Sequence, residues 1–421
     1  MAVVLGRLLA SAFLICSGTG LYSHFLQDPL PWMHFATRPA GLYQLTQGIH
    51  ISAGIACFPL LLGKLHTVFP NLFTYPPIAS FAHFLERVSI TVFVSASLIQ
   101  ISTGLLDTIQ WYPFPFNFRQ THFALSFVII GSLAIHIACK LPVISRYWTR
   151  AASVDSTGAL ILDEADAPLT PEAIANKRAH GPEPVGPVSR RVAGLTGRVF
   201  DWIDGVQGRA PDSAAAAVPD AAAATVSRRG FVATIAVSTT AVVALTSGQS
   251  FAFLDGINVF APRKKGTGAQ SLPINRTARA AQVTPALVDS HWRLTLRNGD
   301  TVREFSRDEL LALPQTTVQL PISCVEGWSQ MATWTGVRLK DLVKTIDAQP
   351  DHNLRLTSLE VKGGYRVTEM GYEYVQDDLT LVALKLGGET LALDHGFPAR
   401  MIAPGRPGVL QTKWLSRIEV I

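Results

Sequence analysis

Four long apolar stretches fill the first third of the chain. They run from about residue 5 to 26, 42 to 62, 88 to 106 and 123 to 139. Each is close to the roughly 20 residues that a helix needs to cross about 30 Å of hydrocarbon. We therefore predict an all-α transmembrane four-helix bundle over residues 1–150.

Lys and Arg residues are unevenly divided between the two ends of these stretches. The richer end carries Lys64, Arg87, Lys140, Arg146 and Arg150. Because basic residues flank the cytoplasmic ends of membrane helices, we expect the N-terminus and the ends of the second and fourth helices in the cytoplasm.

The hydrophobic pattern breaks down over residues 151–226, where Pro, Ala and Gly dominate. This composition is typical of a flexible linker, which we place in the cytoplasm. Ser227-Arg228-Arg229-Gly230-Phe231 then introduces a fifth apolar run. We interpret residues 227–260 as a twin-arginine signal-like membrane anchor, an address for exporting folded proteins. The alternative is an ordinary fifth helix with basic flanking residues.

Alternating apolar and polar positions replace the long runs from about residue 261 onward. "WRLTLRNG", "TTVQLPIS" and "LSRIEVI" follow the period of strands, while "SRDELLAL" and "RLKDLVKTI" follow that of short helices. We expect an α+β domain over residues 261–421.

Composition narrows the function classes. The chain is 48% hydrophobic and only 16% charged, with a formal net charge of +5. Its basic residues flank apolar runs and do not gather into one patch with interleaved aromatic residues, so nucleic-acid binding is not expected. The partner that this composition predicts is the lipid bilayer.

Histidines within the apolar stretches are candidate metal ligands, because ionisable groups are costly in a membrane. His122 and His136 lie 14 residues apart, close to four helical turns and about 21 Å, so they share one helix face. His50 lies at the level of His122 on a parallel helix. We predict that His50 and His122 bind one haem iron and that His136 and His66 bind a second, with His83 as the rival to His66. The alternative is that these histidines bind no metal and form hydrogen bonds within the helix bundle.

This histidine placement resembles that of four-helix membrane dihaem cytochromes b. The resemblance implies two b-type haems that exchange electrons with quinone or quinol.

Cys324 is the only cysteine beyond the apolar stretches that hold Cys16, Cys57 and Cys139. It lies in "PISCVEGWSQ", and "LDHGFPARMIAPGRPGVLQTKW" follows near the C-terminus. Together these segments resemble the sulfite-oxidase family of molybdopterin enzymes, and "CVEGW" resembles the branch of periplasmic methionine sulfoxide reductases. The resemblance implies an extracytoplasmic molybdenum oxidoreductase domain.

The resemblance also implies site residues. Cys324 would ligate molybdenum, since soft thiolates suit this metal, and Glu326 and Trp328 would stand beside the reacting centre. The residues that match cofactor-contacting segments are Asn275, Arg276, Thr277, Ser358, His395, Arg400, Gln411, Thr412 and Lys413.

The acidic Glu326, two positions from the metal ligand, should repel a dianion such as sulfite. We therefore expect reduction of a neutral S-oxide of the methionine sulfoxide kind, free or protein-bound. The alternatives are a sulfite-type dehydrogenase that passes electrons to quinone, and a non-catalytic haem membrane protein with a degenerate molybdopterin domain. The dimerisation domain of sulfite oxidases has no counterpart after residue 421, so we expect a monomeric catalytic domain.

Overall fold

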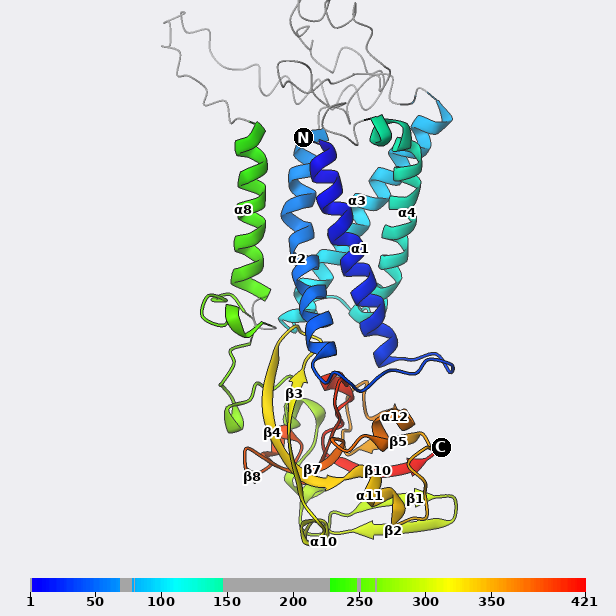
Figure 1. Ribbon diagram of the computed structural model, residues 1–421, viewed down its shortest axis with the longest axis vertical. Helices are drawn as coiled ribbons and strands as arrows, with labels where there is room; N and C mark the ends of the chain where they lie inside the picture. The colour runs from blue at the N-terminus through cyan, green and yellow to red at the C-terminus, as the bar shows by residue number, and fades with distance from the viewer. Residues whose placement is uncertain (1, 69–77, 79, 147–227, 248–250, 262) are drawn as a thin grey trace, which may run out of the picture. The chain divides into compact units, whose positions relative to one another are not determined.

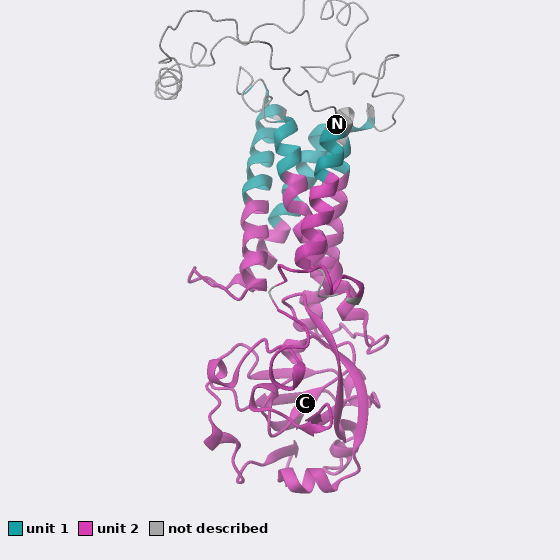
Figure 2. Cartoon of the chain, turned by 90° about the vertical axis from the view of Figure 1, so that its left-hand side faces the viewer, with its two compact units in different colours: residues 1–7, 62–95, 128–235 teal, residues 8–61, 96–127, 236–421 magenta. Residues whose placement is uncertain are grey.

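The computed structural model describes residues 2–68, 78, 80–146, 228–247, 251–261 and 263–421 (Figure 1). The predicted linker and Ser227 of the predicted signal lie outside the described residues. Contacts divide the chain into two units, drawn in two colours in Figure 2. Unit 1 holds residues 1–7, 62–95 and 128–235, and unit 2 holds residues 8–61, 96–127 and 236–421.

The apolar stretches form long helices, as predicted. Their bounds are α1 (Ala2–Gln27), α2 (Leu42–Val68), α3 (Phe81–Thr108), α4 (Phe118–Arg146) and α8 (Arg228–Ser247). In the described part of the chain, these five are long and apolar enough to cross a membrane, so the protein is a multi-pass membrane protein. Helices α3 and α4 begin five to seven residues before their apolar runs, because the backbone hydrogen bonds of a helix continue through polar flanking residues.

Two five-stranded sheets organise the α+β domain. In the first, β10 runs parallel to β1 and antiparallel to β5, giving the order β2-β1-β10-β5-β6. In the second, the order is β3-β4-β7-β8, and β9 pairs with β7. The strands are β1 (Leu294–Asn298), β2 (Thr301–Phe305), β3 (Thr316–Ser323), β4 (Ser329–Arg338), β5 (Leu354–Ser358), β6 (Val367–Met370), β7 (Leu381–Leu386), β8 (Glu389–Thr390), β9 (Arg400–Ile402) and β10 (Leu415–Val420).

Short helices and turns connect the strands. The α-helices are α9 (Ala278–Ala281), α10 (Arg307–Ala312), α11 (Leu339–Lys344) and α12 (Tyr372–Gln376). The 3-10 turns are η4 (Ala252–Leu254), η5 (Ala269–Ser271), η6 (Pro285–Val288), η7 (Leu393–His395) and η8 (Gly408–Leu410). This mixture of strands and short helices confirms the predicted α+β class.

The core of this domain packs around β7, which is buried along almost its whole length. Val382 and Leu384 face one hydrophobic cluster, with Leu356 and Ile418 of the first sheet. Leu381 and Ala383 belong to a second cluster that includes Cys324 and Trp334. Because β7 serves both clusters, the segment that carries Cys324 is anchored to the centre of the domain.

Gly336 lies where β4 and β7 change register, between Thr335 and Gly336. A Cβ atom here would lie only 2.6 Å from Ala383 Cα and closer still to the Val382 carbonyl oxygen. Neither backbone atom can move without disturbing the pairing of the strands.

We predict that Gly336→Ala destabilises the α+β domain by about 1–3 kcal/mol, the usual cost of overpacking a core. Thermal unfolding of the full chain in detergent should show a fall of several degrees in Tm. Gly364→Ala is the control, because its Cβ would meet no heavy atom within 4 Å. Equal Tm values for the two variants would contradict the prediction.

Candidate functional site

Cys324 lies in a tight turn between β3 and β4. The Cys324 amide donates to the Trp328 carbonyl at 2.9 Å, and the Gly327 amide donates to the Cys324 carbonyl at 3.1 Å. Gly327 has a φ of 93°, a conformation that favours glycine. Burial, followed by the neighbouring Glu326 carboxylate, raises the pKa of the Cys324 thiol well above its ordinary value. A thiol at this position needs a nearby cation or metal to become the thiolate.

The Glu326 carboxylate is buried and has several partners. Trp328 Nε1 donates to its Oε2 at 3.0 Å, and the Arg263 guanidinium pairs with the same oxygen at 3.2 Å. Gln110, which follows α3, donates to its other oxygen. Burial raises the pKa of Glu326, while Arg263 opposes that shift. The predicted acidic neighbour of Cys324 is thus present, but Arg263 offsets its charge.

Arg400 opens β9 and is only 1% exposed. Its Nη1 donates to the His395 carbonyl at 3.2 Å, and its guanidinium carbon lies 5.2 Å from the centroid of the Trp334 ring. Its Nε and Nη2 have no hydrogen-bond partner among the described residues. Burial lowers the pKa of Arg400 to about 9, opposed by the nearby Cys324 thiol. Arg400 therefore stands close to Cys324 with unused donors.

Lys413 reaches the same region from the segment before β10. Its ammonium donates to the carbonyl oxygens of Arg276 and Asp394, each at 2.8 Å. Burial, and then repulsion by Arg400, lowers the pKa of Lys413 to about 7. In the described part of the chain, no carboxylate forms an ion pair with Arg400 or Lys413. Two cations held together in this way would gain from an anionic ligand.

Arg406 is a third buried cation that the sequence analysis missed. It is 3% exposed, and its guanidinium carbon lies 5.4 Å from the Tyr374 ring centroid. Its Nη2 donates to the Glu369 carbonyl at 2.6 Å, while Nε and Nη1 lack partners among the described residues. Burial lowers the pKa of Arg406 to about 10. Arg406 stands between the two glycines of "PGRPG". The family motif specifies the Pro and Gly positions of this segment but not the position of Arg406.

Several predicted cofactor residues converge on the segment from Gln411 to Lys413. Ser358 Oγ donates to the Lys413 carbonyl at 2.8 Å, and Gln411 Nε2 donates to the Arg406 carbonyl at 3.0 Å. The Thr412 hydroxyl lies 3.1 Å from that of Thr368. These contacts orient the backbone of the segment, and its role in binding a cofactor stays a prediction.

The remaining predicted residues have local partners. Thr277 caps α9 by accepting from the Ala280 amide, and Arg276 lies 3.4 Å from Glu360. The Asn275 carbonyl accepts from Gln110 at 2.6 Å. His395 Nε2 lies 2.7 Å from the Ala269 carbonyl, and burial lowers the pKa of His395 to about 4. The Ala269 carbonyl holds Nε2 of the neutral His395 ring, so only the opposite edge of the ring can face a ligand.

Of the predicted haem ligands, His50 and His122 come together in unit 2. Their ring centroids are 6.3 Å apart, and the ring planes are nearly perpendicular, at 74°. His50 Nδ1 lies 2.9 Å from the Cys16 carbonyl, and His122 Nδ1 lies 3.3 Å from the Thr103 hydroxyl. Each ring therefore keeps Nε2 available on its opposite edge.

In unit 1, His136 Nδ1 is buried without a hydrogen-bond partner among the described residues. His66 stacks against Phe231 with ring centroids 5.5 Å apart. His83 accepts from Arg87 at 3.0 Å. The predicted partnership of His136 with His66, or with its rival His83, stays a prediction.

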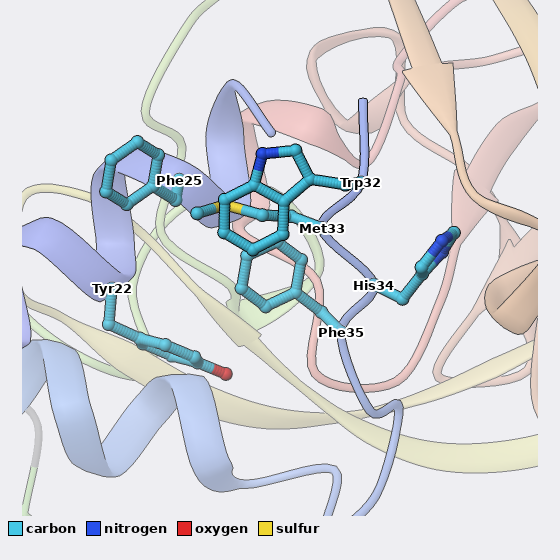
Figure 3. Close-up of a pocket in the computed structure, with 6 residues that line it drawn as sticks. All are labelled: Tyr22, Phe25, Trp32, Met33, His34 and Phe35. Carbon is cyan, nitrogen blue, oxygen red and sulfur yellow. The ribbon is translucent and has the colours of Figure 1, made fainter. Parts of the chain in front are cut away.

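An aromatic pocket of about 410 Å³ lies at the Gln27 end of α1 and in the loop that follows (Figure 3). Figure 3 shows His34 directed away from the other side chains, and His34 Nδ1 lies 2.6 Å from Glu373. The pocket is lined by Tyr22, Phe25, Trp32, Met33, His34 and Phe35. A flat, apolar ligand suits such walls.

Residues 281–421 match the family model for the oxidoreductase molybdopterin binding domain. This part of the chain is therefore a molybdopterin-binding oxidoreductase domain, homologous to sulfite oxidase and to a methionine sulfoxide reductase. The buried cations and Cys324 described above all lie within it.

Three curated relatives illustrate the similarity. Mitochondrial sulfite oxidase of Drosophila melanogaster is 28% identical over 166 residues, which is 32% of this chain and 28% of that protein. The catalytic subunit MsrP of the protein-methionine-sulfoxide reductase of Gluconobacter oxydans is 32% identical over 116 residues, or 23% and 36% of the two chains. YedZ1 of Azospira oryzae, named as a subunit of a protein-methionine-sulfoxide reductase, is 28% identical over 113 residues, or 27% and 42%.

Among solved structures, the chain is similar to the sulfane dehydrogenase SoxCD of Paracoccus pantotrophus. The TM-score is 0.29 at 22% identity, over 31% of this chain and 38% of that one. In each of these comparisons the chain spans less than half of the relative's length.

The low pKa of Lys413 predicts a pH dependence of stability in cofactor-free protein. An unfolded Lys keeps its proton to about pH 10.4, whereas folded Lys413 loses it near pH 7. Above pH 7 the unfolded state therefore binds more protons, so stability rises with pH. We expect the Tm of the cofactor-free chain to rise between about pH 7 and pH 8.5.

Lys413→Met should flatten this rise, because Met carries no proton in either state. Lys344→Met is the matched control, since the Lys344 side chain is 59% exposed. A wild-type rise that Lys413→Met leaves unchanged would show that another group titrates.

Proposed function

We propose that this chain is a membrane-anchored molybdenum oxidoreductase. Electrons would pass between the quinone pool, b-type haems in the helices and molybdenum in the α+β domain, and the substrate would be an S-oxide of the methionine sulfoxide kind. The observation that carries this proposal is the position of buried Arg400 and of Lys413 beside Cys324, in a molybdopterin-binding domain on the same chain as five apolar helices.

The residues at this site fit the molybdenum cofactor. Cys324 offers a thiolate, a ligand that soft metals prefer. The unused donors of Arg400, and those of Arg406 nearby in the chain, could bind the anionic phosphate of the pterin, and Lys413 would take up its proton beside that charge. When bound, this cofactor supplies two-electron oxygen-atom transfer. The chain's residues would hold it, orient it and keep water away from Cys324, which is 2% exposed.

His50 and His122 would hold a haem iron between their imidazoles. Their ring centroids are 6.3 Å apart. Partners on each Nδ1 orient the rings toward such a metal. We assign a second haem to His136 with His66 or, as the alternative, His83.

The aromatic pocket is our candidate for the quinone headgroup. Trp32 and Phe35 offer flat faces, and Tyr22 brings a hydroxyl that can donate to a quinone oxygen. Phe25 of the pocket lies edge-on to Phe123 at 6.5 Å, and Phe123 follows His122 in the chain. A quinol bound here would release its electrons beside the proposed haem.

The charges around Cys324 support an S-oxide as the substrate. Glu326 and Arg263 form a pair with no net charge, which leaves little attraction for a dianion at that point. Two of the similar proteins are named as parts of a protein-methionine-sulfoxide reductase. Reduction of a neutral S-oxide at the expense of quinol is therefore favoured.

A sulfite-type dehydrogenase is the second candidate. The buried Arg400, which lies near Cys324 and has two donor atoms without a partner among the described residues, is the observation in its favour, because a guanidinium can bind a sulfur oxyanion. The similarity to sulfite oxidase points the same way.

We also propose that the α+β domain lies on the extracytoplasmic side. Helix α8 begins at Arg228, so the paired arginines stand at one end of a candidate membrane span. A span in this place would carry the domain across the membrane from a cytoplasmic linker.

A substrate screen monitored by haem absorbance tests the function. Quinol-reduced haem should be reoxidised by an S-oxide, whereas sulfite should leave oxidised haem unchanged. Haem reduction by sulfite would instead establish the dehydrogenase.

We predict that Cys324→Ser removes turnover and most of the bound molybdenum, because an alcohol is a poorer ligand for this metal than a thiolate. The haem spectrum should stay unchanged. Metal analysis and the haem reoxidation assay measure both effects, and Cys139→Ser in α4 is the control. Full activity of Cys324→Ser would exclude Cys324 as the metal ligand.

Gly20 gives a test of the haem proposal. An added Cβ would lie 2.7 Å from His50 Cε1, so Gly20→Ala must displace the ring. If two haems bind, we expect about half of the haem to be lost, measured by the pyridine haemochrome assay. Gly18→Ala is the control, because its Cβ meets no heavy atom within 4 Å. Unchanged haem content and spectrum in Gly20→Ala would argue against ligation by His50.

A further inference from the structure

The turn that carries Cys324 packs against helix α2 next to His50. Gln47 Nε2 donates to the Val325 carbonyl at 2.8 Å. A Cβ on Gly327 would lie 2.8 Å from Ile51 Cγ1, so the turn and the helix are already in contact there. Gln47 and Ile51 are four residues apart and therefore lie on one face of α2, with His50 between them in the chain.

A second contact holds the turn from the end of α3. Gln110 Nε2 donates to Glu326 Oε1, and Gln110 Oε1 accepts from Arg263, which pairs with the same carboxylate. Gln110 thus closes a network around the buried carboxylate of Glu326, the residue between Val325 and Gly327. Helix α2 and the turn after α3 thus hold one turn of the molybdopterin-binding domain.

The turn itself has little freedom to move. Its ends are joined by the hydrogen bond from the Cys324 amide to the Trp328 carbonyl, and Glu326 is bound to the Trp328 indole at 3.0 Å. Trp328 is 1% exposed in the domain core. A contact at Val325 or Gly327 therefore fixes the position of Cys324 as well.

We propose that Gln47 and Gly327 are positioning residues of an electron-transfer junction between the His50–His122 site and Cys324. This inference rests on the proposed function. The rate of electron tunnelling falls steeply with distance, so a fixed packed contact between the two sites keeps every transfer short. A molybdopterin-binding domain attached only through a flexible linker would lie near the haem only part of the time.

The chemistry balances with single-electron steps across this junction. A quinol gives up two electrons and two protons and becomes quinone. An S-oxide takes two electrons and two protons, its S–O bond breaks, and the oxygen leaves as water. Because a haem carries one electron at a time, each turnover crosses the junction twice.

Stopped-flow kinetics tests the junction in the full, cofactor-loaded chain. The haem is reduced with quinol, and its reoxidation is followed after addition of the S-oxide found in the screen. Gln47→Met keeps the length of the side chain but cannot donate to Val325. We expect haem reoxidation to slow by about tenfold, the effect of one lost hydrogen bond on the docked population.

Reduced methyl viologen, which can reach the molybdenum domain directly, should support turnover of Gln47→Met within about twofold of wild type. Gly327→Ala should slow haem reoxidation more than Gln47→Met does, because its Cβ meets Ile51 and because alanine is strained at a φ of 93°. Gln120→Met in α4 is the matched control, because Gln120 is exposed. In cofactor-free protein, hydrogen exchange at residues 323–329 should quicken in Gln47→Met but not in Gln120→Met.

The results of these experiments distinguish a failure of the proposed junction from a failure of the proposed function. If no S-oxide reoxidises wild-type haem, the proposed function fails. If wild-type haem is reoxidised and both Gln47→Met and Gly327→Ala match it, the function stands and the junction is wrong. Equal losses with quinol and viologen, together with lost molybdenum, would also overturn the junction, because the contact would then serve metal binding only.

Discussion

The burial of positive charge beside a cysteine is the constraint on which the rest of this site depends. Arg400 and Arg406 are almost fully buried, with donor atoms that no described residue accepts from. Removing such groups from water without partners is costly, so the fold must recover that cost elsewhere. β7, packed on both faces, supplies the rigid centre. These donors would suit an anion that the described part of the chain does not provide.

This constraint explains the form of the last 30 residues. Arg400, Arg406 and Lys413 stand on three different local structures: a short strand, a Pro-Gly turn and the approach to β10. Gly396 and Gly405 have positive φ values of 108° and 68°, and added Cβ atoms would meet Lys413 and the Thr37 carbonyl. The glycines let the chain fold back closely at these points, where Arg400 and Arg406 are buried and Lys413 is partly buried.

The helices and the α+β domain could be predicted from the sequence because their signals are local, and the candidate site residues Arg400 and Lys413 stand in local motifs. Apolar runs about 20 residues long specify membrane helices, and the "HGFPAR" and "TKW" segments contain Arg400 and Lys413. Arg263 and Gln110 could not be predicted. Both contact Glu326, from 63 and 216 residues away, and neither stands in a motif or a periodic pattern. Arg406 lies inside a motif, but at a position that the motif leaves free.

Glu326 illustrates how such distant contacts change the chemistry inferred from a motif. Considered in the sequence alone, its carboxylate repels anions near Cys324. In the structure, Arg263 lies 3.2 Å away and Gln110 binds the other oxygen, so the charge is largely offset. A buried ion pair without net charge discriminates between substrates mainly by shape and hydrogen bonding, and less by charge. Preference for an S-oxide over sulfite would then depend on shape and hydrogen bonding beside Cys324 more than on the charge of Glu326.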